Sequence, residues 1–162
     1  MLEPLALADT TYPSVVPLPR PHPTPYAVAI ATGVAEELPL INPTSLAGSG
    51  AMVSSLADLQ TWGQALGDGR LIGADLQLER INRSRVVTNG PEYDRYGLGI
   101  GILKGWWGHT GDGLGWQVAT FYDPRTRATI AVMVNATPTG GRPDLNFAQE
   151  IFEALADVVA TR

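Results

Sequence analysis

The chain has 162 residues, a net charge of −5, 44% hydrophobic and 17% charged residues, and no cysteine. This composition is typical of one globular domain and excludes both a disulfide framework and a thiolate metal site. The scattered Lys and Arg residues form no basic stripe, which argues against nucleic-acid binding. No apolar run approaches the length of a membrane span, and MLEPLALADT lacks the basic, apolar pattern of a signal peptide.

Residues 1–46 are rich in proline, as in YPSVVPLPRPHPTPY. Proline has no N–H and restricts the residue before it, so we expect an irregular, extended segment without long helices. Its apolar residues, such as Leu5 and Leu7, predict that it packs on the rest of the domain, because a free linker would be polar. His22 is interpreted as a coil residue of this segment.

Residues 54–82 are predicted to be helical. In SSLADLQTWGQALGDGRL, Ser55 is a capping residue with Asp58 three positions later, and Gly67 and Gly69 end the helix. The apolar residues at helical spacing are Leu56, Leu59, Trp62 and Leu66. A second, short helix is predicted around residues 74–82, followed by the turn-rich stretch TNGPEYD.

Residues 96–162 are predicted to form strands and a final helix. Leu98, Ile100 and Ile102 alternate with glycines, which predicts one strand from residue 96. Further strands are expected in GWWGHTGDGLGW, at 116–122 and at 127–134, the last two joined by the turn DPRT as an antiparallel hairpin.

The last helix carries an apolar stripe and a candidate cap. The stripe is Phe147, Ile151, Leu155 and Val158, and the cap is Asp144. We expect this helix to pack on a three-stranded antiparallel sheet. The predicted class is therefore α+β, with a helical, proline-rich N-terminal part.

The stretch GWWGHTGDGLGW, residues 105–116, is the candidate site. His109 and Thr110 offer hydrogen-bond donors to an anion or a carbonyl, Gly111 admits a ligand to the backbone, and the following N–H groups suit an oxyanion hole. A phosphate-binding glycine loop would open a helix, whereas a strand follows here. Taken alone, His109 is more often a satisfied strand-end histidine, and the tryptophans are more often core than a ligand-stacking wall.

Three stretches resemble the serine β-lactamase and D-alanyl-D-alanine carboxypeptidase superfamily, in its class C-like branch. They are LEPLALADTTYP, LAGSGAMVSSLADLQTWGQALGDGRLI and YGLGIGILKGWWGHTGDGLGWQVATFYDPRTRATIAVMVN. They follow the family order and cover nearly the whole chain. His109-Thr110-Gly111 is similar to the Lys-Thr-Gly triplet of penicillin-interacting proteins.

The resemblance implies acyl transfer by a serine nucleophile on D-Ala-D-Ala peptides, β-lactams or esters, without a metal or cofactor. Thr110 would then bind the substrate carboxylate or carbonyl, and His109 would replace the lysine as a donor. The backbone N–H of Asp112 would be one of two oxyanion donors. The carboxylate of Asp112 departs from the pattern, because it repels an anionic substrate unless it turns away.

The nucleophile motif S-x-x-K is absent, since the only lysine is Lys104 and Gly101 stands three positions before it. No tyrosine is followed two residues later by asparagine. In the family these motifs lie upstream, so residues 1–162 are interpreted as the C-terminal portion of one domain. By itself the chain is expected to be inactive.

The expected partner is the N-terminal half of the domain, from the same gene or a companion chain. Without it, ATIAVMVN would be an apolar edge prone to pairing with a second copy. The alternative is a non-catalytic module that binds peptidoglycan or another ligand through the tryptophan-rich strand end. The resemblance implies a place outside the cytoplasm or in the cell envelope, and the absence of a signal leaves a cytoplasmic one open.

Overall fold

The computed structural model describes residues 2–13, 18, 20–88, 92–113, 115–141 and 144–160. The elements within them are η1 Glu3–Leu5, β1 Tyr26–Ala29, β2 Ala35–Glu37, η2 Pro43–Ser49, α1 Leu56–Asp68, α2 Ala74–Asn82, β3 Arg85–Val86, β4 Arg95–Tyr96, β5 Gly101–Leu103, β6 Trp106–Gly113, β7 Trp116–Tyr122, β8 Thr129–Val134, β9 Ala136–Thr139 and α3 Phe147–Ala160. No helix among these is long and apolar enough to cross a bilayer.

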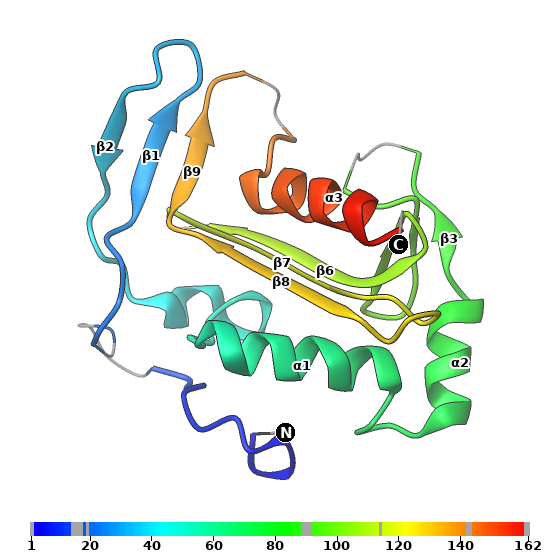
Figure 1. Cartoon of the computed structure of the whole chain (residues 1–162). Helices are drawn as coiled ribbons and strands as arrows, with labels where there is room; N and C mark the ends of the chain where they lie inside the picture. The colour runs from blue at the N-terminus through cyan, green and yellow to red at the C-terminus, as the bar shows by residue number, and fades with distance from the viewer. Residues whose placement is uncertain are drawn as a thin grey trace.

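The large sheet has the strand order β3-β4-β5-β6-β7-β8, and each neighbouring pair is antiparallel. The helix α1 packs on one face of this sheet and α3 on the other (Figure 1). This arrangement confirms the predicted α+β class with a C-terminal helix on an antiparallel sheet. The expected strands β6, β7 and β8 form one side of the sheet, which is wider than three strands because β3, β4 and β5 extend it beyond β6.

The predicted single strand from residue 96 is wrong, because the chain turns back within it. β4 ends at Tyr96 and β5 begins at Gly101, and the two pair as an antiparallel hairpin. In the turn the N–H of Gly97 donates to the carbonyl of Ile100 at 2.7 Å, and Gly99 has a φ of +67°. A positive φ suits glycine, so the apparent alternation is a turn with an exposed Leu98 at its tip.

The helix α1 begins and ends where the sequence predicts. The Ser55 side chain accepts from the N–H of Asp58, and Gly69 ends the helix in the left-handed conformation. The helix approaches the sheet closely at Gly67, which has no side chain. A Cβ on Gly67 would lie 2.2 Å from the Tyr122 ring of β7. Within the apolar stripe, Trp62 packs against the cluster of Leu5, Leu7 and Ala65, whereas Leu56 is 52% exposed.

The helix α3 packs by a face other than the predicted stripe. Its buried residues on the sheet are Ala148, Phe152 and Ala156, whereas Ile151, Leu155 and Val158 are exposed. Phe152 stacks on Phe121 of β7 at a ring distance of 4.2 Å. The cap is Asn146 rather than Asp144, because the Asn146 side chain accepts from the N–H of Gln149 at 3.0 Å.

The proline-rich segment packs against α1, as predicted. Leu5 and Leu7 are buried with Ala65 of α1. The buried carboxylate of Asp58 accepts from the N–H of Asp9 at 2.9 Å and from the Thr10 hydroxyl at 2.7 Å. These contacts fix the segment below α1 (Figure 1).

A second sheet, with the order β2-β1-β9, stands at one end of the molecule (Figure 1). β1 and β2 form a hairpin inside the proline-rich segment, and β1 pairs in parallel with β9, Tyr26 opposite Ala136. The sequence did not predict this sheet. Pro138 lies within β9, and proline is accommodated there because β9 is an edge strand in the part of the chain that the structure describes.

Candidate active site

The strand β6 has one edge without a strand partner over its second half. β5 pairs with β6 only from Leu103↔Trp106 to Gly101↔Gly108, whereas β7 pairs with β6 from Trp107 to Gly113. The predicted residues 109–112 therefore lie on one strand with an open edge among the described residues. An extended substrate can approach backbone groups at such an edge.

Two tyrosines occupy the start of this edge. The Tyr93 hydroxyl lies 2.8 Å from Thr110 Oγ1 and accepts from the backbone N–H of Thr110 at 2.9 Å. It also lies 3.2 Å from His109 Nδ1, and the Tyr96 hydroxyl lies 2.7 Å from His109 Nε2. His109 Nδ1 further contacts the carbonyl oxygen of Thr110. The structure thus brings His109 and Thr110 together with two residues that the sequence analysis did not single out.

Tyr93 reaches Thr110 because Gly101 leaves room for its ring. A Cβ on Gly101 would lie 2.1 Å from the Tyr93 ring. Tyr93 is 7% exposed, and burial raises the pKa of its phenol above the ordinary value, more than the hydrogen bonds from Thr110 lower it. Tyr93 therefore stays a neutral phenol that can both donate and accept. In the sequence, Tyr93 could have been singled out because it is an aromatic residue with a hydroxyl in the turn-rich stretch TNGPEYD, just before the glycine-rich strand.

Asp112 turns its carboxylate away from the open edge. One carboxylate oxygen accepts from Gln117 Nε2 of β7 at 3.0 Å, and the other accepts from the Thr137 hydroxyl of β9. The repulsion expected from this carboxylate is thereby reduced. The Asp112 N–H lies on the same edge as the Thr110 N–H, because backbone donors two residues apart along a strand point the same way.

The far end of β6 is fixed to α3. Asn146 Nδ2 donates to the carbonyl oxygen of Gly111 at 3.2 Å. Gln117 Oε1 accepts from the N–H of Phe147, the first residue of α3, at 2.7 Å. Through Asn146 and Gln117, these bonds join Gly111 and Asp112 to the start of the helix.

The remaining candidates of the sequence lie elsewhere. His22 Nδ1 lies 3.1 Å from the neighbouring Pro23 carbonyl, which agrees with a coil residue outside the site. Trp106 is a core residue, 2% exposed and edge-on to Phe152, whereas Trp107 and Trp116 are half-buried. The tryptophans therefore do not form one exposed wall.

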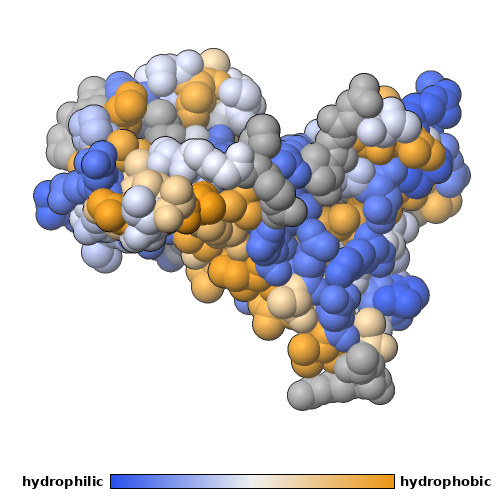
Figure 2. Space-filling view, turned by 90° about the horizontal axis from the view of Figure 1, so that it is seen from above, coloured by the Kyte–Doolittle hydropathy of each residue, from blue (hydrophilic) through white to orange (hydrophobic). Residues whose placement is uncertain are grey.

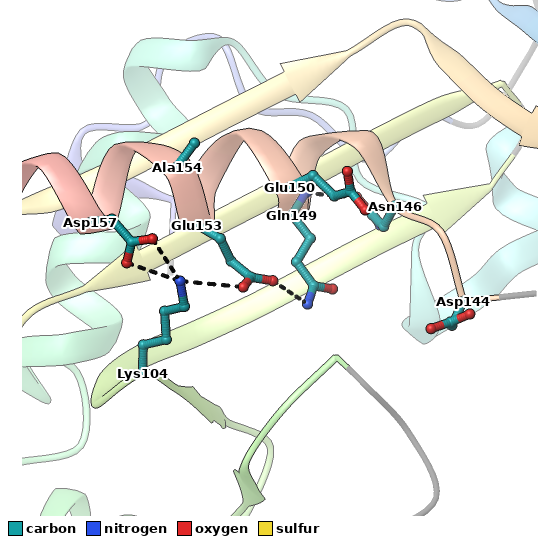
Figure 3. A pocket seen from close by; sticks show the side chains of 8 residues that line it. All are labelled: Lys104, Asp144, Asn146, Gln149, Glu150, Glu153, Ala154 and Asp157. Atoms are coloured by element: carbon teal, nitrogen blue, oxygen red, sulfur yellow. Dashed lines mark hydrogen bonds and ion pairs between the residues drawn. The ribbon is translucent and has the colours of Figure 1, made fainter. Parts of the chain in front are cut away.

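A separate groove of about 520 Å³ runs along α3 (Figure 3). Its lining residues are Lys104, Asp144, Asn146, Gln149, Glu150, Glu153, Ala154 and Asp157. Lys104 Nζ lies 2.9 Å from Asp157 and 3.5 Å from Glu153. The hydrogen bond to Asp157 raises the pKa of Lys104, so this ammonium is paired and is not a proton acceptor. Within the described ranges, no three His, Asp or Glu side chains are grouped to hold a metal ion.

The family model described as Beta-lactamase matches residues 1–154. A D-stereospecific amidohydrolase from Streptomyces sp. is 27% identical, with a TM-score of 0.73 over 95% of this chain and 45% of that one. D-amino acid amidase from Ochrobactrum anthropi SV3, complexed with L-phenylalanine, is 18% identical, with a TM-score of 0.82 over 99% and 48%. A penicillin-binding protein from Bacillus halodurans is 20% identical, with a TM-score of 0.61 over 95% and 47%.

The chain therefore spans about half the length of these solved structures. No curated protein matches the sequence significantly.

Proposed function

The chain belongs to the beta-lactamase family, and on that premise we propose that it is the C-terminal part of a serine hydrolase that cleaves amide or ester bonds. Its contribution is one wall of the active site, formed by His109, Thr110 and Gly111, and one oxyanion donor, the N–H of Asp112. The observation that carries the proposal is the open edge of β6, at which this triplet stands. The nucleophilic serine belongs to the N-terminal part of the domain.

The proposed reaction has two acyl-transfer steps. The serine oxygen attacks the substrate carbonyl carbon, and the carbonyl oxygen takes up negative charge that the Asp112 N–H stabilises. Collapse of this intermediate breaks the bond to the amine or alcohol, which takes up the proton that the serine hydroxyl lost, and leaves an acyl-enzyme. Water then attacks the ester, and the acid and the free serine form. Thr110 orients the substrate by a hydrogen bond to its carboxylate or carbonyl.

The proposed substrates are acyl compounds of the D-amino acid type. D-Ala-D-Ala peptides, β-lactams and esters are expected from the family resemblance. The names of the similar D-stereospecific amidohydrolase and D-amino acid amidase support adding amides of D-amino acids. The family resemblance supports action outside the cytoplasm or in the cell envelope.

The proposed partner is the N-terminal half of the same domain, seated on β8 and α3. β8 is the outer strand of its sheet, with no further strand beyond it among the described residues. A shallow apolar groove beside it is lined by Thr126, Ile130, Leu155, Val158 and Val159. Seen from above, hydrophobic residues form a band next to a hydrophilic one (Figure 2). A strand and a helix of the N-terminal half would cover the free edge of β8 and the apolar groove. A second copy of the chain is the alternative occupant.

The test uses the complete domain, in which this chain is produced together with the N-terminal segment. After incubation with a penicillin or an ester of a D-amino acid, intact-mass measurement should show an acyl adduct on a serine outside residues 1–162. His109→Ala and Thr110→Val should slow acylation about 10- to 100-fold, the effect of losing one hydrogen bond to a charged group. His22→Ala, at the only other histidine, is the matched control and should not change the rate.

Three results would overturn parts of the proposal. An adduct on a serine within residues 1–162 would place the nucleophile in this chain. Acylation that is unchanged in both variants would remove the wall function from the triplet. A complete domain that binds peptidoglycan fragments but never forms an adduct would favour the non-catalytic binding module.

A further inference from the structure

We propose that Tyr93 and Tyr96 are positioning residues that set the hydrogen-bond direction of Thr110 and the tautomer of His109. The inference rests on the proposed function, because it concerns the same open edge of β6. It follows from which atoms around the two hydroxyls can donate and which can only accept. Neither tyrosine is required to touch the substrate.

Tyr93 has a single phenolic hydrogen to donate. The Tyr93 oxygen already accepts from the Thr110 N–H at 2.9 Å. Its hydrogen can be donated either to Thr110 Oγ1, at 2.8 Å, or to His109 Nδ1, at 3.2 Å. The shorter distance favours Thr110 Oγ1. A second observation decides between the two acceptors.

That observation is the contact of His109 Nδ1 with the carbonyl oxygen of Thr110. A carbonyl oxygen only accepts, so Nδ1 must carry the hydrogen of this bond. A protonated Nδ1 cannot accept from Tyr93, whose hydrogen is therefore directed to Thr110 Oγ1. In the neutral imidazole Nε2 is then the acceptor, and the Tyr96 hydroxyl donates to it at 2.7 Å.

The consequence is a polarised chain of hydrogen bonds that ends at the Thr110 hydroxyl, on a side chain that is 7% exposed. Thr110 Oγ1 accepts from Tyr93, so its own hydrogen is directed to another acceptor. A substrate carbonyl or carboxylate oxygen is the acceptor that the proposed function supplies. Thr110 is thus held as a donor before the ligand arrives, and the neutral imidazole of His109 carries its hydrogen on Nδ1.

The surroundings keep the two phenols in place. The Tyr93 and Tyr96 rings lie 5.2 Å apart, and they lie 5.4 and 5.6 Å from the His109 ring. Tyr93 is also packed in the core cluster with Phe121. Each of the three rings therefore contacts the other two.

The first experiment measures the tautomer directly and does not need activity. In the complete domain with 15N-labelled histidine, the NMR shifts of the His109 ring nitrogens should show hydrogen on Nδ1 and none on Nε2. Tyr96→Phe removes the donor to Nε2 and should shift the population toward the other tautomer. A wild-type His109 with its hydrogen on Nε2 would overturn the proposal, even if the protein hydrolyses its substrate well.

The second experiment separates positioning from mere stability. Tyr93→Phe should lower kcat/KM for acylation about 10-fold or more, and in a Thr110→Val background it should have almost no further effect, because it acts through Thr110. Tyr122→Phe is the matched control: Tyr122 is a buried tyrosine of the same sheet whose hydroxyl donates to Asp68 at 2.7 Å, outside the site. Equal losses in Tyr93→Phe and Tyr122→Phe, or additive losses with Thr110→Val, would overturn the inference.

If the wild-type domain forms no acyl adduct at all, the proposed function fails. The NMR measurement still decides the tautomer in that case. The two failures are therefore distinguishable.

Discussion

The packing face of α3 can be tested with two substitutions on one helix, Phe152→Ala and Leu155→Ala. Phe152 is fully buried, stacked on Phe121 at 4.2 Å and edge-on to Trp106 at 5.6 Å. Leu155 belongs to the stripe that helical periodicity predicts to be buried, yet it is 45% exposed. The two variants therefore ask which side of the helix faces the sheet.

The expected magnitudes differ clearly. Removing a fully buried phenylalanine costs about 3–5 kcal/mol of unfolding free energy, because burial and ring contacts are lost and a cavity remains. Truncating Leu155 should cost about 1 kcal/mol in this chain alone, since half of its side chain already contacts water.

Urea unfolding of the chain, followed by circular dichroism, measures both costs. With a denaturant slope of about 2 kcal/mol per molar urea, Phe152→Ala should lower the midpoint by about 2 M and Leu155→Ala by about 0.5 M. Equal shifts, or a larger shift for Leu155→Ala, would refute the reasoning and restore the packing face predicted from the sequence.

Two further predictions concern stability. Gly67→Val should lower the unfolding free energy by about 1–3 kcal/mol, because its Cβ would lie 2.2 Å from the Tyr122 ring; thermal denaturation checks this against Gly48→Ala, whose Cβ meets nothing within 4 Å. Burial alone would raise the pKa of Asp123, but hydrogen bonds from Arg125 outweigh it and lower the pKa. A lowered folded-state pKa gives stability above about pH 4 that is lost as the pH falls further. In urea unfolding, the stability difference between wild type and Asp123→Asn should therefore shrink from pH 6 to pH 3, and a constant difference would contradict it.

Features set by a few neighbouring residues were predictable from the sequence. Ser55 caps α1 by bonding the N–H three residues later, and Gly69 ends it with a positive φ. The hairpin of β7 and β8 follows from two apolar runs around DPRT, and it was predicted with nearly the observed bounds. Such features need no information about distant parts of the chain.

The packing of α3 was not predictable because the helix has two apolar sides. One side has a large residue between two small ones, Ala148, Phe152 and Ala156, which lets the helix approach the sheet closely. The other carries larger aliphatic residues and dominates a periodicity count. Periodicity identifies an apolar stripe, but it does not say which of two stripes the sheet will cover.

The site was predictable only along its own strand. His109, Thr110, Gly111 and Asp112 share β6, so sequence spacing alone placed them together. Tyr93 reaches the same edge because the β4–β5 hairpin folds back and leaves room for its ring. The sequence pattern predicts one continuous strand from residue 96, so neither Tyr96 at the end of β4 nor Tyr93 just before β4 is singled out.

The pairing of β1 with β9 has a consequence for synthesis of the chain. Asn135 Nδ2 donates to the Thr24 carbonyl at 2.7 Å, across 111 positions of sequence, and the next strand supplies the Thr137 hydroxyl that binds Asp112. The strand β1 pairs with β2 along one edge and with β9 along the other. The hairpin of β1 and β2 can form early, but the edge that pairs with β9 waits until β9 has left the ribosome. The Asp112 end of the candidate site is thus among the last parts to be completed on a nascent chain.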